Sequence, residues 1–247
     1  MSEQIVVRKA VKIYNESTPY AFKALNEVSF EIQKGDFVAI VGPNGSGKTT
    51  LLNLLGVMDV TSSGYIKIND INTMLIALDH TSFKKKVRIG YLLQEDYLIE
   101  EMKVKDNLEI PLLLTGKRTA NAAERQLAYF GLEDCLNKYP YQLSVGQRLK
   151  VSLLRSLINS PEVLVADEPT GNLDEESGQE VMRLLKKYQE ENATTVIVVT
   201  HDIRVAVCSD YCLFINEGKI CERVESGADY HNRIKAAYDR IDEKRFV

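Results

Sequence analysis

A phosphate-binding loop is the first group of residues in this 247-residue chain whose types and spacing could do chemistry. The pattern G-x-x-x-x-G-K-[ST] is matched by the run Gly42-Pro43-Asn44-Gly45-Ser46-Gly47-Lys48-Thr49. Glycines allow backbone N–H groups to curl around phosphates, and a helix that starts here adds its positive N-terminal dipole. Lys48 would bring a full charge to the β- and γ-phosphates, and the Thr49 hydroxyl would coordinate Mg²⁺. We assign Thr50 to the same nucleotide site.

Two adjacent carboxylates could supply the rest of the chemistry. Asp167 and Glu168 directly follow the apolar run 163–166, at the strand end where ligands of open α/β sheets bind. A strand parallel to the phosphate-loop strand would deliver Asp167 beside Thr49, on the Mg²⁺ side. Glu168 could then face the γ-phosphate and hold or deprotonate an attacking water. The alternative is two solvent-facing acids, or a helix cap, at a strand end.

Strands and helices must position these groups. Three continuously apolar runs are typical of strands buried on both faces, namely Phe37–Val41, Val163–Ala166 and Thr195–Val199. Helical patterns surround them at Thr49–Val57, Arg148–Asn159 and Glu175–Glu191. This interleaving predicts an α/β fold of the P-loop NTPase type, with a mostly parallel core sheet covered on both sides.

Further segments complete the predicted layout. Ile5–Tyr14 and Val28–Ile32 alternate apolar and polar residues, which predicts an N-terminal antiparallel β subdomain. After another core strand at Ile89–Leu93, residues from about 95 to 158 predict an inserted α-helical subdomain. Helical spacing of apolar residues predicts an amphipathic helix at about 228–246 that packs on its own domain or, second, on a partner. Without repeats or linkers, residues 1–247 are expected to form a single domain.

Composition excludes several classes of protein. Hydrophobic residues make up 45% and charged residues 27% of the chain, the mixture of a folded, water-soluble domain. The net charge of -4 supplies no basic surface for a nucleic-acid backbone, so no nucleic acid is expected as a partner. No apolar run approaches the roughly 18 residues of a membrane-spanning helix. The four cysteines, without a Cys-x-x-Cys pair, are expected to be free thiols in a reducing cytoplasm.

A second motif decides among the many proteins that carry phosphate loops. Leu143-Ser144-Val145-Gly146-Gln147 resembles the LSGGQ signature of the ATP-binding cassette (ABC) family, and it stands just before the helix leading to the Asp167 strand, as in that family. Four other positions resemble family motifs and occur in the family's order. Tyr14 resembles the aromatic residue that stacks on adenine, and Gln94 resembles the glutamine that senses Mg²⁺ and the attacking water. Asp174 resembles the dimer-contacting aspartate, and His201 resembles the histidine that touches the γ-phosphate.

The resemblance implies an ATP hydrolase that uses ATP and Mg²⁺. In such an enzyme the catalytic residues would be Glu168, His201 and Gln94. The metal would lie among Thr49, Gln94 and Asp167. The nucleotide would contact Tyr14, the phosphate loop and Asp174. In the family ATP also drives two cassettes into a head-to-tail homodimer, in which Ser144, Gly146 and Gln147 of one copy lie at the γ-phosphate held by the other.

The resemblance also implies an integral membrane permease as partner and a peripheral location on the cytoplasmic face of the cell membrane. In the family, a groove bordered by the Gln94 loop and the helical subdomain receives a short cytoplasmic helix of the membrane protein. The nearby leucines 112–114 either pack inward or belong to this surface. The runs 51–56 and 166–174 look most like the ATPases of lipoprotein-release, macrolide-export and antimicrobial-peptide-resistance systems. Export or extraction of lipoprotein, peptide or drug is therefore the expected process.

The signature departs from the family pattern at two positions. Val145 replaces its first glycine, and Lys150 replaces the usual arginine three positions after its glutamine. Val145 removes some backbone freedom, but the LSVGQ form occurs in working cassettes of the family, so activity is expected to survive. Lys150 keeps the charge but loses the planar fork that makes bidentate contacts.

The competing hypothesis is a soluble ABC-type ATPase of DNA repair or translation. Chromosome-type cassettes insert long coiled coils between the glutamine loop and the signature, whereas Gln94 and Ser144 are only 50 positions apart. Translation-type cassettes carry two ATPase units in one chain, and this sequence has one. A binding-only cassette is disfavoured because Glu168 and His201 are intact. A transporter ATPase is the leading hypothesis.

Overall fold

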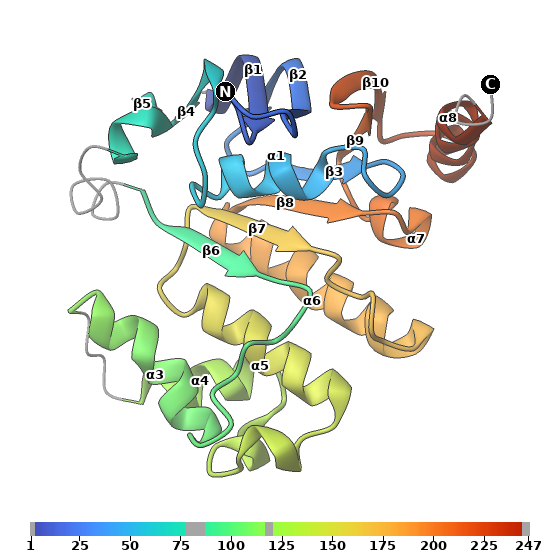
Figure 1. The fold of residues 1–247 in the computed structure, drawn as a ribbon. Helices are drawn as coiled ribbons and strands as arrows, with labels where there is room; N and C mark the ends of the chain where they lie inside the picture. The colour runs from blue at the N-terminus through green and yellow to red at the C-terminus, as the bar shows by residue number, and fades with distance from the viewer. Residues whose placement is uncertain (1–2, 78–86, 117–120, 244–247) are drawn as a thin grey trace.

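A mostly parallel sheet forms the centre of the molecule (Figure 1). The computed structural model describes residues 3–77, 87–116 and 121–243, and within them six strands form this sheet in the order β10-β9-β3-β8-β7-β6. Their bounds are β3 Phe37–Val41, β6 Ile89–Leu92, β7 Val163–Asp167, β8 Thr195–Thr200, β9 Tyr211–Asn216 and β10 Lys219–Glu225. β10 pairs antiparallel with β9, and the other neighbours run parallel. The predicted fold class is confirmed.

Helices cover both faces of the core sheet, as its continuously apolar strands require. On one face lies α1 (Lys48–Leu55), which shares a buried cluster with Val38 and Ile40 of β3. On the other face lie α5 (Val145–Leu157) and α6 (Glu175–Asn192), whose cluster includes Phe37. α1 and α5 are therefore separated by the core sheet.

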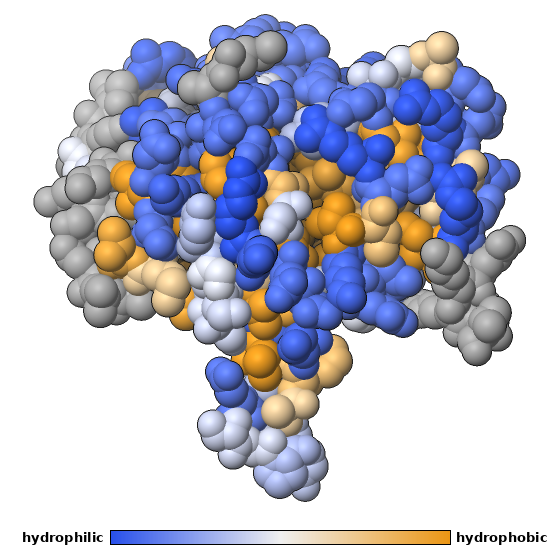
Figure 2. Space-filling view, turned by 90° about the horizontal axis from the view of Figure 1, so that it is seen from above, coloured by the Kyte–Doolittle hydropathy of each residue, from blue (hydrophilic) through white to orange (hydrophobic). Residues whose placement is uncertain are grey.

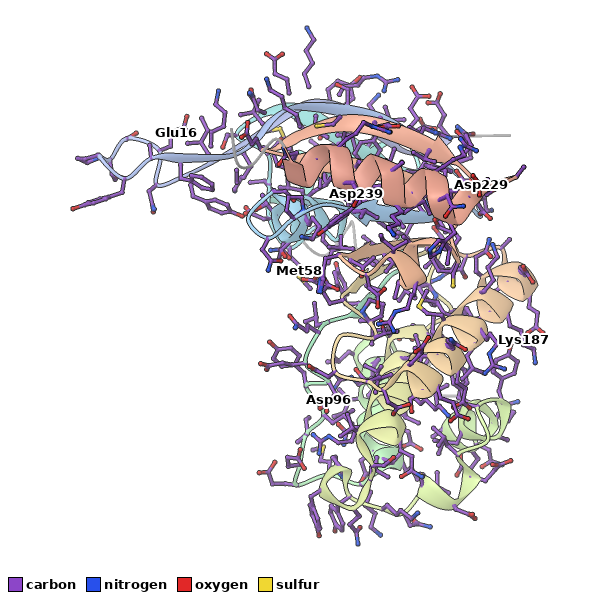
Figure 3. The ribbon with its side chains drawn as sticks, turned by 90° about the vertical axis from the view of Figure 1, so that its right-hand side faces the viewer. Glu16, Met58, Asp96, Lys187, Asp229 and Asp239 are labelled. Atoms are coloured by element: carbon purple, nitrogen blue, oxygen red, sulfur yellow. The ribbon has the colours of Figure 1, made fainter. Side chains whose placement is uncertain are left out.

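A second, antiparallel sheet lies above α1 in Figure 1. Its strand order is β2-β1-β4-β5, with bounds β1 Glu3–Tyr14, β2 Phe22–Gln33, β4 Ser63–Ile68 and β5 Ile71–Asn72, and the 3₁₀ turn η1 (Thr73–Ala77) follows. β2 starts earlier than Val28, because Phe22 pairs with Tyr14 across the hairpin. The hairpin projects from the molecule, with Glu16 near its tip (Figure 3).

The helical subdomain lies at the other end of the molecule (Figure 1). It contains α3 (Val104–Leu114), α4 (Ala122–Tyr129), two 3₁₀ turns (η2 Glu133–Cys135, η3 Pro140–Gln142) and α5. α5 starts at Val145 rather than at the expected Arg148, because Ser144 caps its N-terminus. Asp96 lies at the junction between this subdomain and the core (Figure 3).

The last helix, α8 (Tyr230–Glu243), packs on the chain's own β9 and on the short helix α7 (Ile203–Ala206). Tyr230, Ile234 and Ala237 are buried in this contact. Residues 244–246 of the expected helix lie outside the described residues. On the face seen in Figure 2 hydrophilic residues predominate, with apolar residues in small patches between them. Within the described ranges, no helix has both the length and the apolar character needed to cross a bilayer.

Candidate functional site

Strand register brings the predicted site residues to one edge of the core sheet. In the parallel ladder, Leu92 pairs with Ala166, Asp167 with Val199 and Val41 with Thr200. The residues that follow these strands therefore emerge side by side at the carboxyl edge, where ligands of such sheets bind. They are Gln94, Glu168, His201 and the phosphate loop.

The phosphate loop fits tightly between its neighbours. Gly47 has a φ of 103°, and a Cβ there would lie 2.7 Å from the carbonyl oxygen of Ala24. A Cβ on Gly42 would lie 2.2 Å from the carbonyl oxygen of Ile215. The Lys48 ammonium donates to the carbonyl oxygens of Gly42 at 2.8 Å and Pro43 at 3.0 Å. The loop therefore wraps around the lysine, and only glycine satisfies both backbone positions.

The loop also has the polar groups that a phosphate would need. Ser46 Oγ is buried and, within the described residues, has no hydrogen-bond partner. A buried hydroxyl of this kind is satisfied when a ligand oxygen accepts its hydrogen bond. Asn44 and Gly45 are exposed at the rim of the loop, and Thr50 is half-buried in the first turn of α1. These features fit a bound phosphate chain.

Asp167 lies beside Thr49, as the sequence predicted, and accepts a hydrogen bond from its side chain. Burial and the adjacent charge of Glu168 raise the pKa of Asp167, against the opposing effects of Thr49 and Lys48. A hydroxyl and a carboxylate are the oxygen donors that Mg²⁺ prefers. No group of three or more His, Cys, Asp or Glu side chains within the described ranges could hold a metal. The donor set suits an ion that shares its shell with phosphate oxygens and water.

Glu168 is held by the end of β8. Thr200 Oγ1 donates to its Oε2 at 3.0 Å, and the His201 backbone N–H donates to Oε1 at 3.1 Å. The His201 ring nitrogen Nδ1 lies 2.6 Å from the same Oε1. The side chain of Glu168 is 13% exposed and that of His201 57% exposed, so a shielded carboxylate meets an accessible imidazole.

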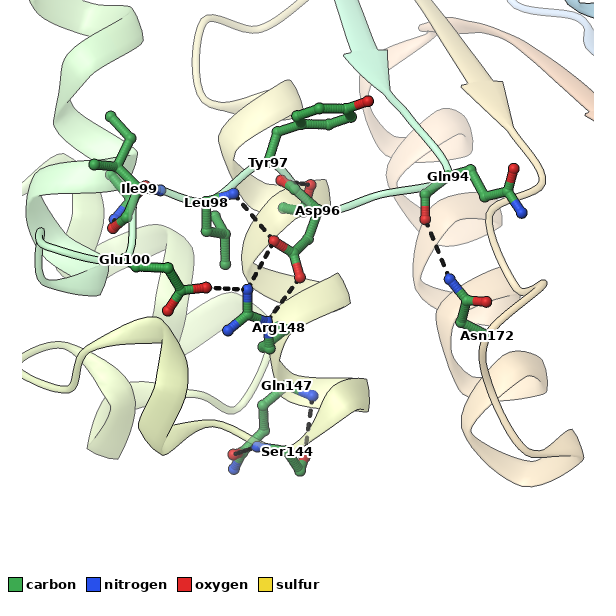
Figure 4. A network of polar contacts seen from close by, with 12 residues as sticks. Gln94, Asp96, Tyr97, Leu98, Ile99, Glu100, Ser144, Gln147, Arg148 and Asn172 are labelled. Atoms are coloured by element: carbon green, nitrogen blue, oxygen red, sulfur yellow. Dashed lines mark hydrogen bonds and ion pairs between the residues drawn. The ribbon is translucent and has the colours of Figure 1, made fainter.

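Gln94 and Glu168 line one cleft, together with Asp96, Tyr97, Val145 and Arg148 among others. Gln94 is exposed, and its carbonyl oxygen lies 3.5 Å from the Asn172 amide nitrogen (Figure 4). The cleft runs from the carboxyl edge of the sheet to the helical subdomain. Of the three leucines 112–114, Leu112 is buried, whereas Leu113 and Leu114 are 52% and 83% exposed.

Tyr14 lies at the end of β1, half-buried, with the Lys12 ammonium 5.1 Å from its ring centre. The same hairpin is tied to the phosphate loop through one turn. In that turn the Gly218 N–H donates to the Ser46 carbonyl at 2.9 Å, and the Gly218 carbonyl accepts from the Asn26 N–H at 2.8 Å. Tyr14 therefore belongs to an element anchored beside the loop.

Asp174 caps the N-terminus of α6. Its carboxylate accepts from the Ser177 N–H at 3.0 Å and from the Ser177 hydroxyl at 2.8 Å. These two hydrogen bonds lower the pKa of Asp174. In a single chain the residue therefore has a structural function as a helix cap.

The signature residues lie away from the phosphate loop of their own chain, since α5 and α1 cover opposite faces of the sheet. Ser144 and Gln147 form a capping box, in which Ser144 Oγ accepts from the Gln147 N–H at 3.2 Å and Gln147 Oε1 accepts from the Ser144 N–H at 3.0 Å (Figure 4). Gly146 is half-buried, and Val145 is 60% exposed and turned into the cleft. Lys150 pairs with Glu180 of α6 at 2.6 Å.

Sequence reasoning missed three contributors to this site. Thr200 orients Glu168, Asn172 contacts Gln94, and Arg148 pairs with Asp96 next to Gln94. The partners in each pair lie 32, 78 and 52 positions apart, so no local spacing signals them.

Comparison with known proteins identifies the family. The profile of the family described as ABC transporter matches residues 25–171. The chain is also 36% identical over 236 residues to the uncharacterised ABC transporter ATP-binding protein MJ0796 of Methanocaldococcus jannaschii, covering 93% of this chain and 100% of that protein. The chain belongs to the ABC transporter family. The resemblance predicted from the motifs is confirmed, and the chain is an ABC transporter ATPase.

Other ABC relatives include two of the export systems expected from the sequence. The lipoprotein-releasing system ATP-binding protein LolD of Legionella pneumophila is 36% identical, covering 87% of this chain and 96% of that protein. The macrolide export ATP-binding/permease protein MacB of Vibrio parahaemolyticus is 41% identical over 79% of this chain, which spans only 30% of that protein. A dimeric structure of MJ0796 in a post-hydrolysis state, bound to ADP and Pi, superimposes with a TM-score of 0.81 at 33% identity, covering 90% of this chain and 99% of that one.

Proposed function

We propose that this cassette powers a membrane permease from the cytoplasmic face, and that it works as a homodimer in the export or extraction of a lipoprotein, peptide or drug. The observation that carries this proposal is the cleft between Gln94, Glu168 and the helical subdomain. The cleft extends from Gln94 and Glu168, the residues assigned to the γ-phosphate, to an open surface of the helical subdomain where a partner could bind. The similarity to LolD, of a lipoprotein-releasing system, and to MacB, a macrolide exporter, supports export or extraction without specifying one substrate.

ATP would be anchored by the phosphate loop and stacked on Tyr14. The positive end of α1 and the Lys48 ammonium would face the phosphates. Thr49 and Asp167 would hold Mg²⁺, which when bound neutralises charge on phosphate oxygens. Burial raises the pKa of Asp167, and a bound cation would oppose this shift by stabilising the ionised carboxylate.

Hydrolysis would use the residues at the carboxyl edge. Glu168 would orient a water and accept its proton as the water oxygen attacks the γ-phosphorus and the bond to ADP breaks. His201 would contact the γ-phosphate, and Gln94 would lie on the water side. Glu168 is already fixed by Thr200 and His201, so its carboxylate needs little reorganisation.

A second copy would complete each site. Ser144 is exposed at the N-terminus of α5, on the far side of the sheet from the phosphate loop of its own chain. A helix N-terminus attracts anions, so Ser144, Gly146 and Gln147 of one copy would close on the γ-phosphate bound by the other. The dimeric structure of the relative MJ0796, bound to ADP and Pi, supports an assembly of two copies.

The alternative of a DNA-repair or translation ATPase receives no support from the helical subdomain. Between Gln94 and Ser144, the described residues form two helices of 11 and 8 residues and two 3₁₀ turns, and no coiled coil. The exposed Tyr97, Ile99 and Met102 near the cleft instead offer apolar surface to a protein partner.

Cysteine cross-linking in native membranes tests the permease proposal. The background is Cys221→Ser, which removes an exposed thiol. In this background Tyr97→Cys should capture an integral membrane protein, because Tyr97 is 59% exposed beside the cleft. Lys235→Cys, exposed on α8, is the matched control and should give no such adduct. Adducts from Tyr97→Cys with soluble proteins or nucleic acid alone would overturn the transporter assignment.

A further inference from the structure

The segment that follows Gln94 is fastened along one face of α5. Three side chains of α5, spaced as neighbours on one helix face, bind it. Arg155 donates to the carbonyl oxygens of Tyr97 at 2.7 Å and Asp96 at 2.9 Å, and Ser152 Oγ donates to the Asp96 carbonyl at 3.0 Å. The third side chain is Arg148.

Arg148 holds two carboxylates at once (Figure 4). Its guanidinium forms a bidentate pair with Asp96, with distances of 2.7 Å and 3.0 Å, and also lies 2.5 Å from Glu100 Oε1. The side chains of Arg148 and Asp96 are each 23% exposed. Burial tends to raise the pKa of Asp96, but hydrogen bonds and charge from Arg148 outweigh it, and the pKa is lowered. We name Arg148, Asp96 and Glu100 the α5 clamp.

The α5 clamp leaves little free chain around Gln94. On one side β6 ends at Leu92, which pairs with Ala166 in the core sheet. On the other side Asp96 is fixed to α5 and accepts the Leu98 N–H at 3.0 Å, which stiffens the segment. Only residues 93–95 separate these two fixed points, so a displacement of α5 shifts one end of the short segment that carries Gln94.

The same helix carries the signature. Ser144 caps α5, and the Arg148 backbone N–H donates to the Ser144 carbonyl at 2.9 Å. The residue that faces the other copy and the segment that carries Gln94 are therefore attached to one rigid element, one helical turn apart. The clamp residues also line the cleft, where a bound partner would touch them.

We propose that Arg148 is a positioning residue that ties the placement of Gln94 to the position of Ser144 through the α5 clamp. This inference rests on the proposed function, in which Gln94 and Ser144 both address a γ-phosphate. Without the guanidinium, Asp96 and Glu100 would lose their shared cation, and the Gln94 segment would keep only two of its three attachments to α5, those to Ser152 and Arg155. Contact between α5 and the other copy would then no longer determine the position of Gln94.

The test is Arg148→Gln in the full chain. Turnover at saturating ATP should fall by about 10- to 100-fold, the effect of misplacing a catalytic group by about 1 Å, while ATP affinity stays within about twofold, because the anchoring contacts are untouched. Arg148→Lys keeps the charge but not the fork, so its turnover should lie between wild type and Arg148→Gln. Arg240→Gln, which breaks a remote pair with Glu222 at 2.8 Å, is the control and should turn over normally.

Two further measurements separate positioning from simple destabilisation. Hydrogen exchange without nucleotide should quicken for amides 94–98 in Arg148→Gln and stay unchanged in α3. In a Glu168→Gln background, Arg148→Gln should still form the ATP-bound dimer. The proposal for the α5 clamp would be overturned if Arg148→Gln left both turnover and exchange unchanged. It would also be overturned if this variant lost ATP affinity and turnover in parallel. A wild-type chain that neither hydrolyses ATP nor dimerises would instead overturn the proposed function, and the exchange comparison would still decide the clamp.

Discussion

The carboxylate charge of Asp167 lies at a position where the folded chain disfavours a negative charge. Burial and the neighbouring Glu168 raise its pKa in the folded chain. A raised pKa means that the folded state binds the proton more tightly than the unfolded state does. The free energy of unfolding therefore falls as the pH rises through the folded-state pKa, and the nucleotide-free protein is less stable at neutral pH than a neutral side chain would make it.

Asp167→Asn should accordingly stabilise the nucleotide-free protein. We expect Tm at pH 7.5 to rise by about 2–4 °C, or about 1 kcal/mol for a chain of this size, and the gain to shrink as the pH falls toward about 4. Scanning calorimetry with and without Mg²⁺ would measure this. Asp202→Asn is the contrasting variant, because hydrogen bonds from Arg204 outweigh burial and lower the pKa of Asp202. It should lower Tm, and an equal change in both variants would contradict the electrostatic account.

At the same scale, the sequence was a good guide to the motifs and a poor one to their partners. The phosphate loop and Asp167–Glu168 could be predicted because the chemistry is carried by contiguous residues after apolar runs. Arg148 looked like the start of a helix pattern, and nothing in its neighbourhood pointed to Asp96, 52 positions away. Such pairs exist only after α5 has packed against the segment from β6.

Among the elements, the ends of helices and strands were predicted correctly where the local sequence marks them clearly. β3 was predicted at Phe37–Val41 and forms there, because a fully buried run between glycines has sharp ends. α5 was expected from Arg148 but starts at Val145, and the Ser-x-x-Gln capping box at 144–147 was a readable signal for that start. β2 was underestimated because cross-strand pairing with β1, rather than local alternation, extends it to Phe22.

α8 gives an element-scale prediction. Ile234 is fully buried against α7 and β9, so Ile234→Ala should lower the free energy of unfolding by about 2–5 kcal/mol. Lys235→Ala, exposed one position later, should leave it within about 0.5 kcal/mol. Urea unfolding of both variants measures the difference. Equal, small losses would show that α8 contributes little to the stability of this domain.

Across the whole molecule, the predicted site residues lie on two separate surfaces. The core sheet delivers the phosphate loop, Asp167, Glu168 and His201 to one edge, whereas the signature lies on a helix behind the opposite face. Under the proposed function, a single chain therefore carries both halves of the site and needs a second copy to bring them together. The cleft beside Gln94 lies between these halves, so a partner bound there would influence both.

The measurement that tests this account most directly is ATP turnover per chain as a function of protein concentration, in saturating ATP and Mg²⁺. If each site is completed by Ser144 of a second copy, turnover per chain should rise with concentration and then reach a plateau. The turnover per chain of Ser144→Ala should stay close to that of the most dilute wild-type protein at every concentration, while the variant still binds ATP. A turnover per chain that is the same at all concentrations, or that survives Ser144→Ala unchanged, would contradict the two-copy site.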